Sequence, residues 1–498
     1  MGTRAFSMMA GLFLLANLAQ GQERIVLSEQ AADLTVISPE EVFKFGSSLS
    51  CGDVNGDELE DLVVGAPSYN EVGEPLGGRV YLIYGRSSFP DTLDWPEGMS
   101  VIIAPDSVDL GWAVACGDVN TDGIDDILIG APWSSPLGRR EAGAVYIIYG
   151  KTTGLPEVWN LNISPADELI VGREEGDALG VSLALGDVNN DGLQDLTLGA
   201  FTARRPDSTR YLAGSVFLLL NTKNPPVIED LASASRPVVQ MVGEWPNDYC
   251  GWAVACGDVN GDPLADVLIG AHKANPHLPD EGKAYLISGR PTFAGVVTIN
   301  MDTADVQFQG GQFQEHLAYS LAIGDFNGDK LGDVVLGSRQ GSPEEVIRAG
   351  RMRVVFGNSA LPESIDFKSS SPDLDVYGEV SGSMLGTALA VGDVNGDGFD
   401  DLLAGAPFSE FNLPTPPGRA YLFLGDPNFS GVWDLKIRPA ALSIVGADSS
   451  DHLGASLACG DLNGDGYDDI IVAAPGGKSG GAIYVIFGRK TTHIIDPQ

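Results

Sequence analysis

The feature that most constrains this chain is an acidic loop, Asp-x-Asn-x-Asp-x-x-x-Asp, that occurs seven times. The loops begin at Asp53, Asp118, Asp187, Asp258, Asp325, Asp393 and Asp461, so successive copies are 65 to 71 residues apart. A repeat of this period that fills a chain predicts one supersecondary unit copied many times. Solenoid repeats are usually shorter, which favours a closed ring of units.

Each unit has further landmarks at fixed distances from its loop. The units open with an apolar residue, usually followed by Gly, near residues 45, 110, 179, 250, 317, 385 and 453. A Gly-Ala-Pro-like turn follows each loop, and it is complete at Gly65-Ala66-Pro67, Gly130-Ala131-Pro132 and Gly405-Ala406-Pro407. It departs from this pattern at Gly199-Ala200-Phe201, Gly270-Ala271-His272, Gly337-Ser338-Arg339 and Ala473-Ala474-Pro475. The offsets hold in all seven copies, so the units are equivalent.

Four short strand patterns can be read in each unit. One ends at the acidic loop, one leaves it, a third has the form GRVYLIYG, and an outer one has the form SVIIAP or ELIVGR. Gly and Pro separate these patterns, and no helical periodicity accompanies them. The sequence therefore predicts an all-β fold, a seven-bladed β-propeller of four-stranded antiparallel blades.

The two ends of the chain are expected to share one blade. The seventh unit ends with its third strand pattern at Gly481 to Gly488, and the residues after it hold no fourth strand pattern. Before the first unit, Asp33 to Ser38 resembles the outer strands of other units, such as Glu168 to Arg173. We expect this N-terminal strand to complete blade seven and close the ring, so that neither terminal blade needs a polar cap.

The acidic loops have the composition of calcium sites. Calcium takes about six to eight oxygen ligands, so a short loop must turn several oxygens toward one point. Side chains at positions 1, 3, 5 and 9 and the backbone carbonyl at position 7 are expected to do so, much as in the first half of an EF-hand. The predicted ligands are Asp53, Asn55, Asp57, Leu59 and Asp61; Asp118, Asn120, Asp122, Ile124 and Asp126; Asp187, Asn189, Asp191, Leu193 and Asp195; Asp258, Asn260, Asp262, Leu264 and Asp266; Asp325, Asn327, Asp329, Leu331 and Asp333; Asp393, Asn395, Asp397, Phe399 and Asp401; and Asp461, Asn463, Asp465, Tyr467 and Asp469.

Two other interpretations of the loops are an Asx-turn hairpin and a different metal. An Asx-turn explains a preference for Asp and Asn, but not four retained positions in seven copies or the crowding of like charges. Magnesium shares the oxygen ligands but favours rigid octahedral sites with retained water, and zinc prefers His or Cys. Up to seven calcium ions are therefore expected.

Position 6 is expected to make the seven sites unequal, because it requires a residue that can adopt positive φ. Gly123, Gly192, Gly398 and Gly466 meet this requirement. Glu58 and Lys330 would adopt it at a cost on the order of 1 kcal/mol. Pro263 is restricted to φ of about −65°. The loop that begins at Asp258 is therefore the least certain site.

Composition excludes several classes of function. The chain has 29 basic and 68 acidic residues and a formal charge of −39, which repels phosphate backbones and anionic lipid surfaces. Nucleic acid is thus not expected as a partner. A hydrophobic content of 44% with 19% charged residues excludes an acidic disordered chain.

Residues 1–21 have the pattern of a signal peptide. Arg4 precedes an apolar run from Ala5 to Ala19, and the small-x-small sequence Ala19-Gln20-Gly21 comes before Gln22. The run is shorter than the roughly 20 residues of a membrane span, which favours a cleaved leader over an anchor. We expect residues 22–498 to form the mature propeller, without a membrane anchor and secreted or extracellular, with a periplasmic or cell-surface location as the other options.

The five cysteines are expected to be free and unreactive. Cys51, Cys116, Cys256 and Cys459 stand two residues before the first Asp of a unit, where other units have Leu185, Ile323 and Val391. Cys250 takes the place of an opening apolar residue. All five are therefore interpreted as small buried hydrophobic residues rather than disulfide partners.

Taken together, the units resemble FG-GAP repeats, which form the seven-bladed propeller at the head of integrin alpha subunits and occur in many bacterial secreted proteins. The resemblance covers about residues 32 to 490 and rests on Phe45-Gly46, the Asp53 to Asp61 loop and the Gly65-Ala66-Pro67 turn. Ala318 departs from it, because it stands where the opening Gly is expected.

The resemblance implies that calcium loops join the first and second strands on one face and that partners dock on the opposite face. That docking face comprises the loops after each Gly-Ala-Pro turn and those that join consecutive blades. The aromatic residues expected there are Trp133, Phe201, Trp245, Tyr249 and Phe408. Packing against neighbouring loops is the other interpretation of these residues, so none is assigned as a binding residue.

The expected function is a non-catalytic recognition or adhesion module for a protein or glycan ligand, with hairpins stiffened by calcium. An alternative is an enzyme that acts on polysaccharide, a lyase or a glycosidase. The five His residues fall singly, no nucleophile elbow is present, and the carboxylate pairs belong to the metal loops, so no catalytic residue is assigned. A lectin or a structural coat component is a third option, although the loop aromatics differ from blade to blade.

Overall fold

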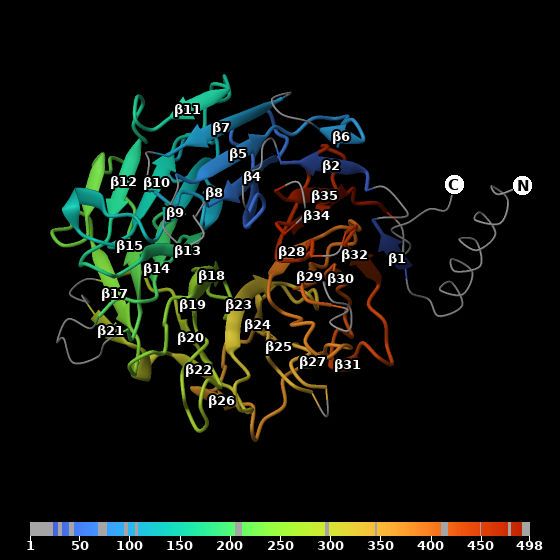
Figure 1. The fold of residues 1–498 in the computed structure, drawn as a ribbon. Coiled ribbons are helices and arrows are strands. Elements are labelled where there is room, and N and C mark those ends of the chain that lie inside the picture. The colour runs from blue at the N-terminus through green and yellow to red at the C-terminus, as the bar shows by residue number, and fades with distance from the viewer. Residues whose placement is uncertain are drawn as a thin grey trace, which may run out of the picture.

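Seven β-sheets surround a central axis in the computed structural model (Figure 1). The structure describes residues 23–27, 32–38, 44–67, 77–93, 98–104, 108–204, 212–293, 298–343, 346–409, 417–448, 450–476 and 480–490. Within these ranges, helix is limited to two short 3₁₀ turns, Pro136–Gly138 and Met301–Thr303. The predicted all-β, seven-bladed propeller is confirmed. The predicted signal peptide lies outside the described residues.

The first strand of each blade lies nearest the axis. These strands contact one another in sequence around the ring, including the first with the seventh. They are β3 (Ser48–Gly52), β8 (Val114–Gly117), β13 (Leu179–Gly186), β18 (Ala253–Gly257), β23 (Leu317–Gly324), β28 (Leu389–Gly392) and β33 (Ser456–Gly460). Their side chains line a central channel.

The second strand of each blade runs from the ninth residue of the acidic loop to the Gly-Ala turn. All six residues of each are buried, because neighbouring blades cover both faces. These strands are β4 (Asp61–Ala66), β9 (Asp126–Ala131), β14 (Asp195–Ala200), β19 (Asp266–Ala271), β24 (Asp333–Ser338), β29 (Asp401–Ala406) and β34 (Asp469–Ala474).

The third and fourth strands complete an antiparallel meander in each blade. The third strands are β5 (Arg79–Ile83), β10 (Ala144–Ile148), β15 (Ser215–Leu219), β20 (Lys283–Ile287), β25 (Arg351–Val355), β30 (Arg419–Phe423) and β35 (Ala482–Ile486). The fourth strands are β7 (Met99–Ile103), β12 (Glu168–Val171), β17 (Val238–Val242), β22 (Val306–Gln309), β27 (Leu374–Tyr377), β32 (Leu442–Val445) and β2 (Leu34–Ile37).

Each sheet also has a fifth strand, which the prediction of four-stranded blades missed. The fifth strands are β11 (Val158–Asn160), β16 (Ile228–Asp230), β21 (Thr298–Asn300), β26 (Ser364–Asp366), β31 (Gly431–Asp434), β1 (Glu23–Val26) and β6 (Thr92–Leu93). Each pairs in parallel with the fourth strand of the blade before its own unit. They are two to four residues long, which is too short to carry a readable alternation.

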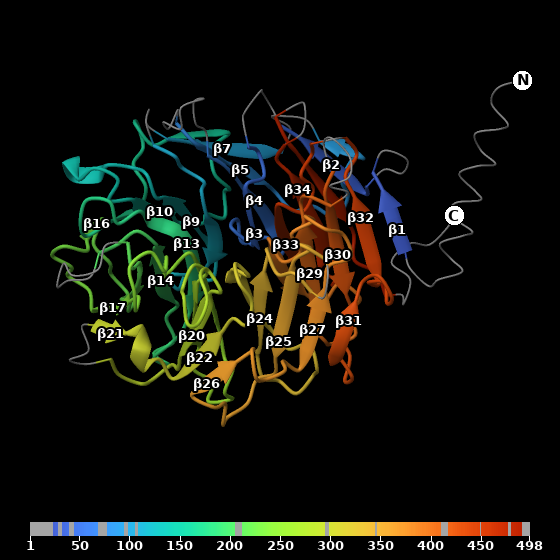
Figure 2. The same cartoon turned by 60° about the horizontal axis from the view of Figure 1, so that its bottom comes forward.

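The N-terminal segment lies beside the last blades. Strand β2 pairs antiparallel with β35, with Leu34 opposite Val485, and β1 pairs in parallel with β32 (Figures 1 and 2). Asp33 adds an ion pair with Arg489, at 2.9 Å from its Nη2 atom. Closure of the propeller by this strand stays a prediction that unfolding experiments test.

Among the described residues, seven apolar clusters lie between adjacent blades, one for each pair, and a smaller eighth cluster surrounds Phe201. The cluster between the seventh and first blades, for example, contains Leu34, Val36, Leu62, Tyr81 and Ile471, each at most 1% exposed. Burial of such side chains stabilises the fold by about 1.5–3 kcal/mol each. The blades therefore depend on their neighbours rather than on cores of their own.

The opening glycines adopt left-handed backbone conformations at the start of the first strands. Gly46, for example, has φ of +84°, and a Cβ atom there would lie 2.8 Å from the Ala473 side chain. Ala318 takes the same conformation with φ of +62°, although it carries a side chain. The replacement of the opening Gly by Ala318 therefore leaves the backbone conformation unchanged but strains it, at a cost of about 1 kcal/mol.

All five cysteines are free, as predicted. Cys250 is fully buried, but the other four are only partly buried, because they lie on or beside the innermost strands that line the channel. These four are therefore less buried than the interpretation as buried hydrophobic residues implies. Desolvation raises the pKa of each thiol, which disfavours the reactive thiolate.

Deletion of residues 22–39 is expected to destabilise the propeller strongly, because it removes β1 and β2 from the last two blades. Leu34→Ala alone is expected to lower the free energy of unfolding by about 2–5 kcal/mol through a buried cavity. Ile37→Ala, at a 37% exposed side chain of the same strand, is the matched control with a much smaller loss. Chemical denaturation measures all three, and a deletion variant as stable as the full chain would refute closure by this strand.

Candidate functional site

The acidic loops join the first and second strands of each blade, so the structure brings the predicted residues of each set together in one hairpin. Position 1 follows the end of the first strand, and position 9 begins the second. Because the loops recur at the same end of every blade, they form a belt around one face of the propeller.

The first Asp of each loop caps the backbone of the turn. In the first loop, Asp53 accepts hydrogen bonds from the N–H groups of Gly56 at 2.6 Å, Asp57 at 3.1 Å and Glu58 at 2.8 Å. In all seven loops, the fifth residue accepts a hydrogen bond from the N–H group of the seventh. These contacts fix the loop backbone before any ion is considered.

The ninth Asp is a buried brace. Its two carboxylate oxygens accept hydrogen bonds from the N–H group at position 2 and from a backbone N–H group just after the third strand, at 2.7–3.2 Å in all seven blades. Asp61, for example, links Val54 to Gly85. This carboxylate therefore ties the acidic loop to the far end of the blade.

The structure also gives a reason for Asn at position 3. Its side-chain amide donates to the ninth carboxylate in five loops, as Asn120 does to Asp126 at 3.1 Å. An Asp at this position would place a second negative charge against a buried one. The amide oxygen is left on the loop side, where Asn120 accepts from the N–H group of Asp122 at 2.8 Å.

Burial and mutual repulsion make the loops electrostatically unfavourable without a cation. Desolvation is the largest cause that raises the pKa of the ninth Asp, to about 7 for Asp61 and to about 8 for Asp401 and Asp469. Loop neighbours at positions 1 and 5 add to the rise. Among the described residues, no Lys, Arg or His forms an ion pair with these loop carboxylates.

The donor set fits a hard divalent cation, because it consists of carboxylate, amide and carbonyl oxygens alone. As the side chains are placed, no group of three or more His, Cys, Asp or Glu in the described part of the chain converges on one point. The loop carboxylates point instead to backbone N–H groups. The Asx-turn interpretation and the calcium interpretation thus share these contacts, and calcium binding stays a prediction.

Loop four differs from the others at position 6. Pro263 is held at φ of +33°, in the left-handed region where the other loops also place this residue. In the other six loops, the N–H group at position 6 donates to the first Asp at 2.8–2.9 Å. Proline has no N–H group, so Asp258 lacks this bond. The strained φ and the missing hydrogen bond are the physical reasons to expect that this loop is the weakest calcium site.

Adjacent loops are linked around the ring. In six of the seven loops, the N–H group at position 8 donates to the carbonyl of position 1 in the preceding blade, as from Asp125 to Asp53 at 2.9 Å and from Glu60 to Asp461 at 3.2 Å. Side chains at position 7 also reach the preceding loop, where Gly396 leaves space beside Tyr467. A change in one loop is therefore felt by its neighbour.

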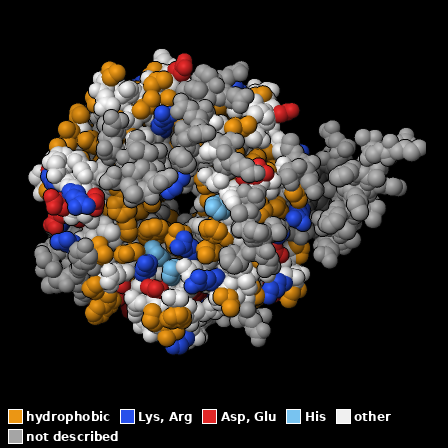
Figure 3. All heavy atoms as spheres, viewed as in Figure 1, with side chains coloured by type: hydrophobic (Ala, Val, Ile, Leu, Met, Phe, Trp, Pro, Cys, Tyr) orange, Lys and Arg blue, Asp and Glu red, His pale blue; other side chains and the backbone are white. Residues whose placement is uncertain are grey.

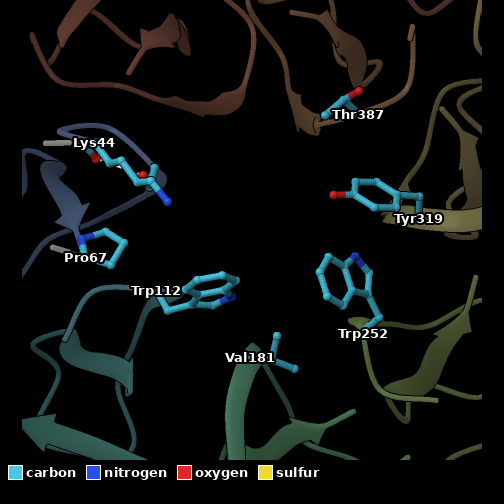
Figure 4. Close-up of a pocket in the computed structure, with 8 residues that line it drawn as sticks. Lys44, Pro67, Trp112, Val181, Trp252, Tyr319 and Thr387 are labelled. Carbon is cyan, nitrogen blue, oxygen red and sulfur yellow. Dashed lines mark hydrogen bonds between the residues drawn. The ribbon is translucent and has the colours of Figure 1, made fainter. Parts of the chain in front are cut away.

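A cavity of about 350 Å³ lies at the opposite end of the channel (Figure 4). Trp112, Trp252 and Tyr319 point toward one another across it in the close-up. The other lining residues are Lys44, Ser47, Pro67, Val181 and Thr387. This end carries the starts of the innermost strands and the Gly-Ala-Pro turns, so it is the predicted docking face.

The predicted docking aromatics are placed unequally. Trp133, Phe201 and Tyr249 belong to one network of edge-to-face rings, with Phe201 centred 5.4 Å from Tyr249. Phe408 stands apart against His452, with ring centroids 5.1 Å apart, and Trp245 is 58% exposed. Packing thus accounts for most of these residues, as the alternative interpretation held.

Sequence reasoning missed the three rings that line the cavity itself. Trp112, Trp252 and Tyr319 each follow the opening Gly or its Ala substitute. The equivalent residues of other units include Ser47, Val181 and Thr387, which also line the cavity. Alignment of this one position across the units would have found the channel mouth.

Comparison with known proteins places four of the seven repeats in a family. The FG-GAP repeat model matches residues 45–83, 110–148, 385–423 and 453–486, which are blades one, two, six and seven. Integrin alpha pat-2 of Caenorhabditis briggsae is 35% identical over 189 residues, 35% of this chain and 14% of that protein. The predicted resemblance is confirmed.

Similarity to a named enzyme extends over a larger part of the chain. Phosphatidylinositol-glycan-specific phospholipase D of Bos taurus is 28% identical over 412 residues, 77% of this chain and 46% of that protein. The protein of the same name from Dictyostelium discoideum is 25% identical over 484 residues, 86% of this chain and 49% of that protein. The chain thus spans about half the length of these relatives.

These relatives contradict the prediction that the chain is not an enzyme. That prediction rested on the absence of a readable catalytic motif, and its enzymatic alternative was limited to enzymes that act on polysaccharide. Similarity to proteins named as phospholipases over most of the chain overturns it. In the described ranges, no helix has the length and apolar character needed to cross a membrane.

Pro263→Gly is expected to raise the free energy of unfolding by about 1–2 kcal/mol, because it relieves a strained φ and restores a donor to Asp258. Pro226→Gly, at a proline outside the loops and without positive φ, is the matched control and should be neutral or slightly destabilising. Denaturant unfolding of both variants in calcium-free buffer measures the difference. A Pro263→Gly variant less stable than the parent would contradict this reading of loop four.

Proposed function

Because this chain is an integrin-alpha-like FG-GAP propeller, we propose that it is a calcium-stabilised recognition module. Its seven acidic loops would bind calcium, and the opposite face would bind a ligand. The observation that carries the proposal is the sevenfold recurrence of one all-oxygen donor set that no basic side chain of the described residues neutralises. A location outside the cell, where calcium is abundant, is part of the proposal.

Calcium would act on the fold through charge. Three aspartates in each of seven loops place 21 of the 68 acidic residues on one face. Unbalanced charge of one sign destabilises a compact state. A cation that binds the folded chain but not the unfolded chain stabilises the folded state. Adjacent loops are hydrogen-bonded, so ions in the belt would stiffen the ring that positions the opposite face.

Removal of calcium is expected to lower the unfolding temperature of the whole chain. At a calcium concentration of about 100 Kd, each occupied site contributes roughly 2.7 kcal/mol. Differential scanning calorimetry in calcium, in magnesium and in chelator measures the unfolding temperature. Its rise above the value in chelator should be larger in calcium than in magnesium. An unfolding temperature that is the same in all three buffers would contradict the proposal.

Asp191→Asn tests one loop without removing its turn. The Asn oxygen can still accept the hydrogen bond from the Leu193 N–H group, now 3.0 Å from Asp191, but the charge is lost. This variant should keep its chelator-state stability and lose part of the calcium stabilisation. Asp302→Asn, at an exposed aspartate outside the loops, should retain all of it.

Hydrolysis of phosphatidylinositol glycans is the second candidate function. It is favoured by similarity to proteins named phosphatidylinositol-glycan-specific phospholipase D, which the chain matches over about half of their length. The purified chain, incubated with a glycan-anchored protein in detergent, is expected to hydrolyse the bond between the lipid phosphate and the inositol. The protein would be released with its glycan and inositol, and the lipid would remain as phosphatidic acid. Unchanged anchor after prolonged incubation in calcium would reject hydrolysis by this chain alone.

A further inference from the structure

The blades contribute different residue types to the channel mouth at one equivalent position of the repeat. The residue after the opening Gly or its substitute is Ser47, Trp112, Val181, Trp252, Tyr319, Thr387 and Ala455 in chain order. The first six of these line the mouth. Large rings therefore occur only in blades two, four and five. The other blades place small or β-branched side chains there, so the mouth is built with one aromatic side.

A second set of substitutions supports the same side. The third residue of the Gly-Ala-Pro turn is proline in blades one, two, six and seven, but Phe201, His272 and Arg339 in the three between. These three pack directly on the mouth rings: Phe201 lies 5.2 Å from Trp252 and His272 lies 5.3 Å from Tyr319, between ring centroids. The turn proline is thus replaced, in three adjacent blades, by side chains that pack against the mouth rings. The three mouth rings, Trp112, Trp252 and Tyr319, are called the aromatic platform below.

The platform carries its own positive charge. The Arg339 guanidinium lies 3.9 Å from the centre of the Tyr319 ring, and the Lys273 amino group lies 4.8 Å from that of Tyr249. Lys44 lines the cavity from the other side, and none of the described lining residues is acidic. Lys, Arg and His side chains gather about the central hollow on this face (Figure 3). In a chain of charge −39, this is a local reversal of sign.

These features select a class of ligand. Half-buried Trp and Tyr rings offer flat apolar faces to the C–H groups of a sugar ring. The hydroxyl oxygens of Ser47, Thr387 and Tyr319 can accept hydrogen bonds from its hydroxyl groups, although the Ser47 and Thr387 hydrogens are already donated to backbone carbonyls. Aromatic rings also attract cations, but Arg339 already lies over the Tyr319 ring, and Lys273 lies over that of Tyr249. A guest cation would be repelled, and a guest anion attracted.

We propose that the channel mouth binds an oligosaccharide that carries an anionic group, with its sugar rings against Trp112, Trp252 and Tyr319 and its anionic group toward Lys44 and Arg339. This inference rests on the proposed recognition function and names its ligand class and site. His272 has a supporting role, since it is only 3% exposed and packs against Trp252 at 4.9 Å between ring centroids.

Calorimetric titration of the calcium-loaded chain with a phosphorylated mannose oligosaccharide tests the proposal. We expect tighter binding than to the dephosphorylated parent, and a heparin oligosaccharide shows whether a sulfate serves as well. Inorganic phosphate alone should compete weakly, because it has no sugar ring. Binding of none of the anionic oligosaccharides, or equal binding of the neutral parent, would overturn the proposal, as would preferential binding of an Arg-containing peptide.

Two pairs of variants locate the site. Trp252→Ala should lower affinity about tenfold or more, whereas Trp245→Ala, at an exposed Trp that does not line the cavity, should not. Lys44→Gln should reduce the preference for the phosphorylated over the neutral sugar, whereas Lys223→Gln, at an exposed lysine outside the cavity, should preserve it. Undiminished binding by Trp252→Ala would place the ligand elsewhere and overturn the assignment.

The readouts keep this inference separate from the proposed function. Lys44→Gln changes an exposed side chain, so it remains informative if Trp252→Ala does not fold. Calcium-dependent unfolding temperatures measured on the same samples report the acidic loops alone. Calcium stabilisation without anionic oligosaccharide binding would overturn only the inference, and loss of both would overturn the recognition module as well.

Discussion

In every blade, a buried aspartate at the ninth loop position holds the acidic loop to the far end of the same blade through two backbone N–H groups. The rest of the structure depends on this contact. It fixes where the first strand ends and the second begins, and it sets the position of the loop relative to the third strand. Such a carboxylate is costly to bury unless its oxygens are satisfied, and here the backbone satisfies them.

The brace also accounts for the charge pattern of the loops. Asn at position 3 donates to the buried carboxylate, and Asp at positions 1 and 5 caps exposed backbone N–H groups. The result is an ordered hairpin with excess negative charge at its surface. A cation bound there would relieve the repulsion without any rearrangement of the brace. The opposite face is free to vary, and the three middle blades have exchanged turn prolines for Phe201, His272 and Arg339.

Much of this could be predicted because it repeats. The loop pattern, the opening Gly and the turn recur at fixed offsets, so the blade number and the positions of four strands follow from the sequence. The fifth strands could not be predicted, because residues such as Thr92 and Leu93 form only a two-residue pairing that depends on the neighbouring blade. Trp252 and Tyr319 were not predicted for another reason: they follow the opening Gly or its substitute, whereas the predicted aromatic residues Trp245 and Phe408 lie in the turn loops. The prediction of no enzymatic activity failed because it was drawn from the absence of a motif.

The central claim is that the acidic belt is a set of calcium sites built on the buried brace. Crystals grown with calcium and measured at a long wavelength test it most directly, because anomalous difference density locates each ion. The account predicts peaks inside the loops, among the side chains of positions 1, 3, 5 and 9, with the loop at Asp258 the weakest. Loops that carry no anomalous peak in saturating calcium, with the same hydrogen bonds to backbone N–H groups, would contradict it.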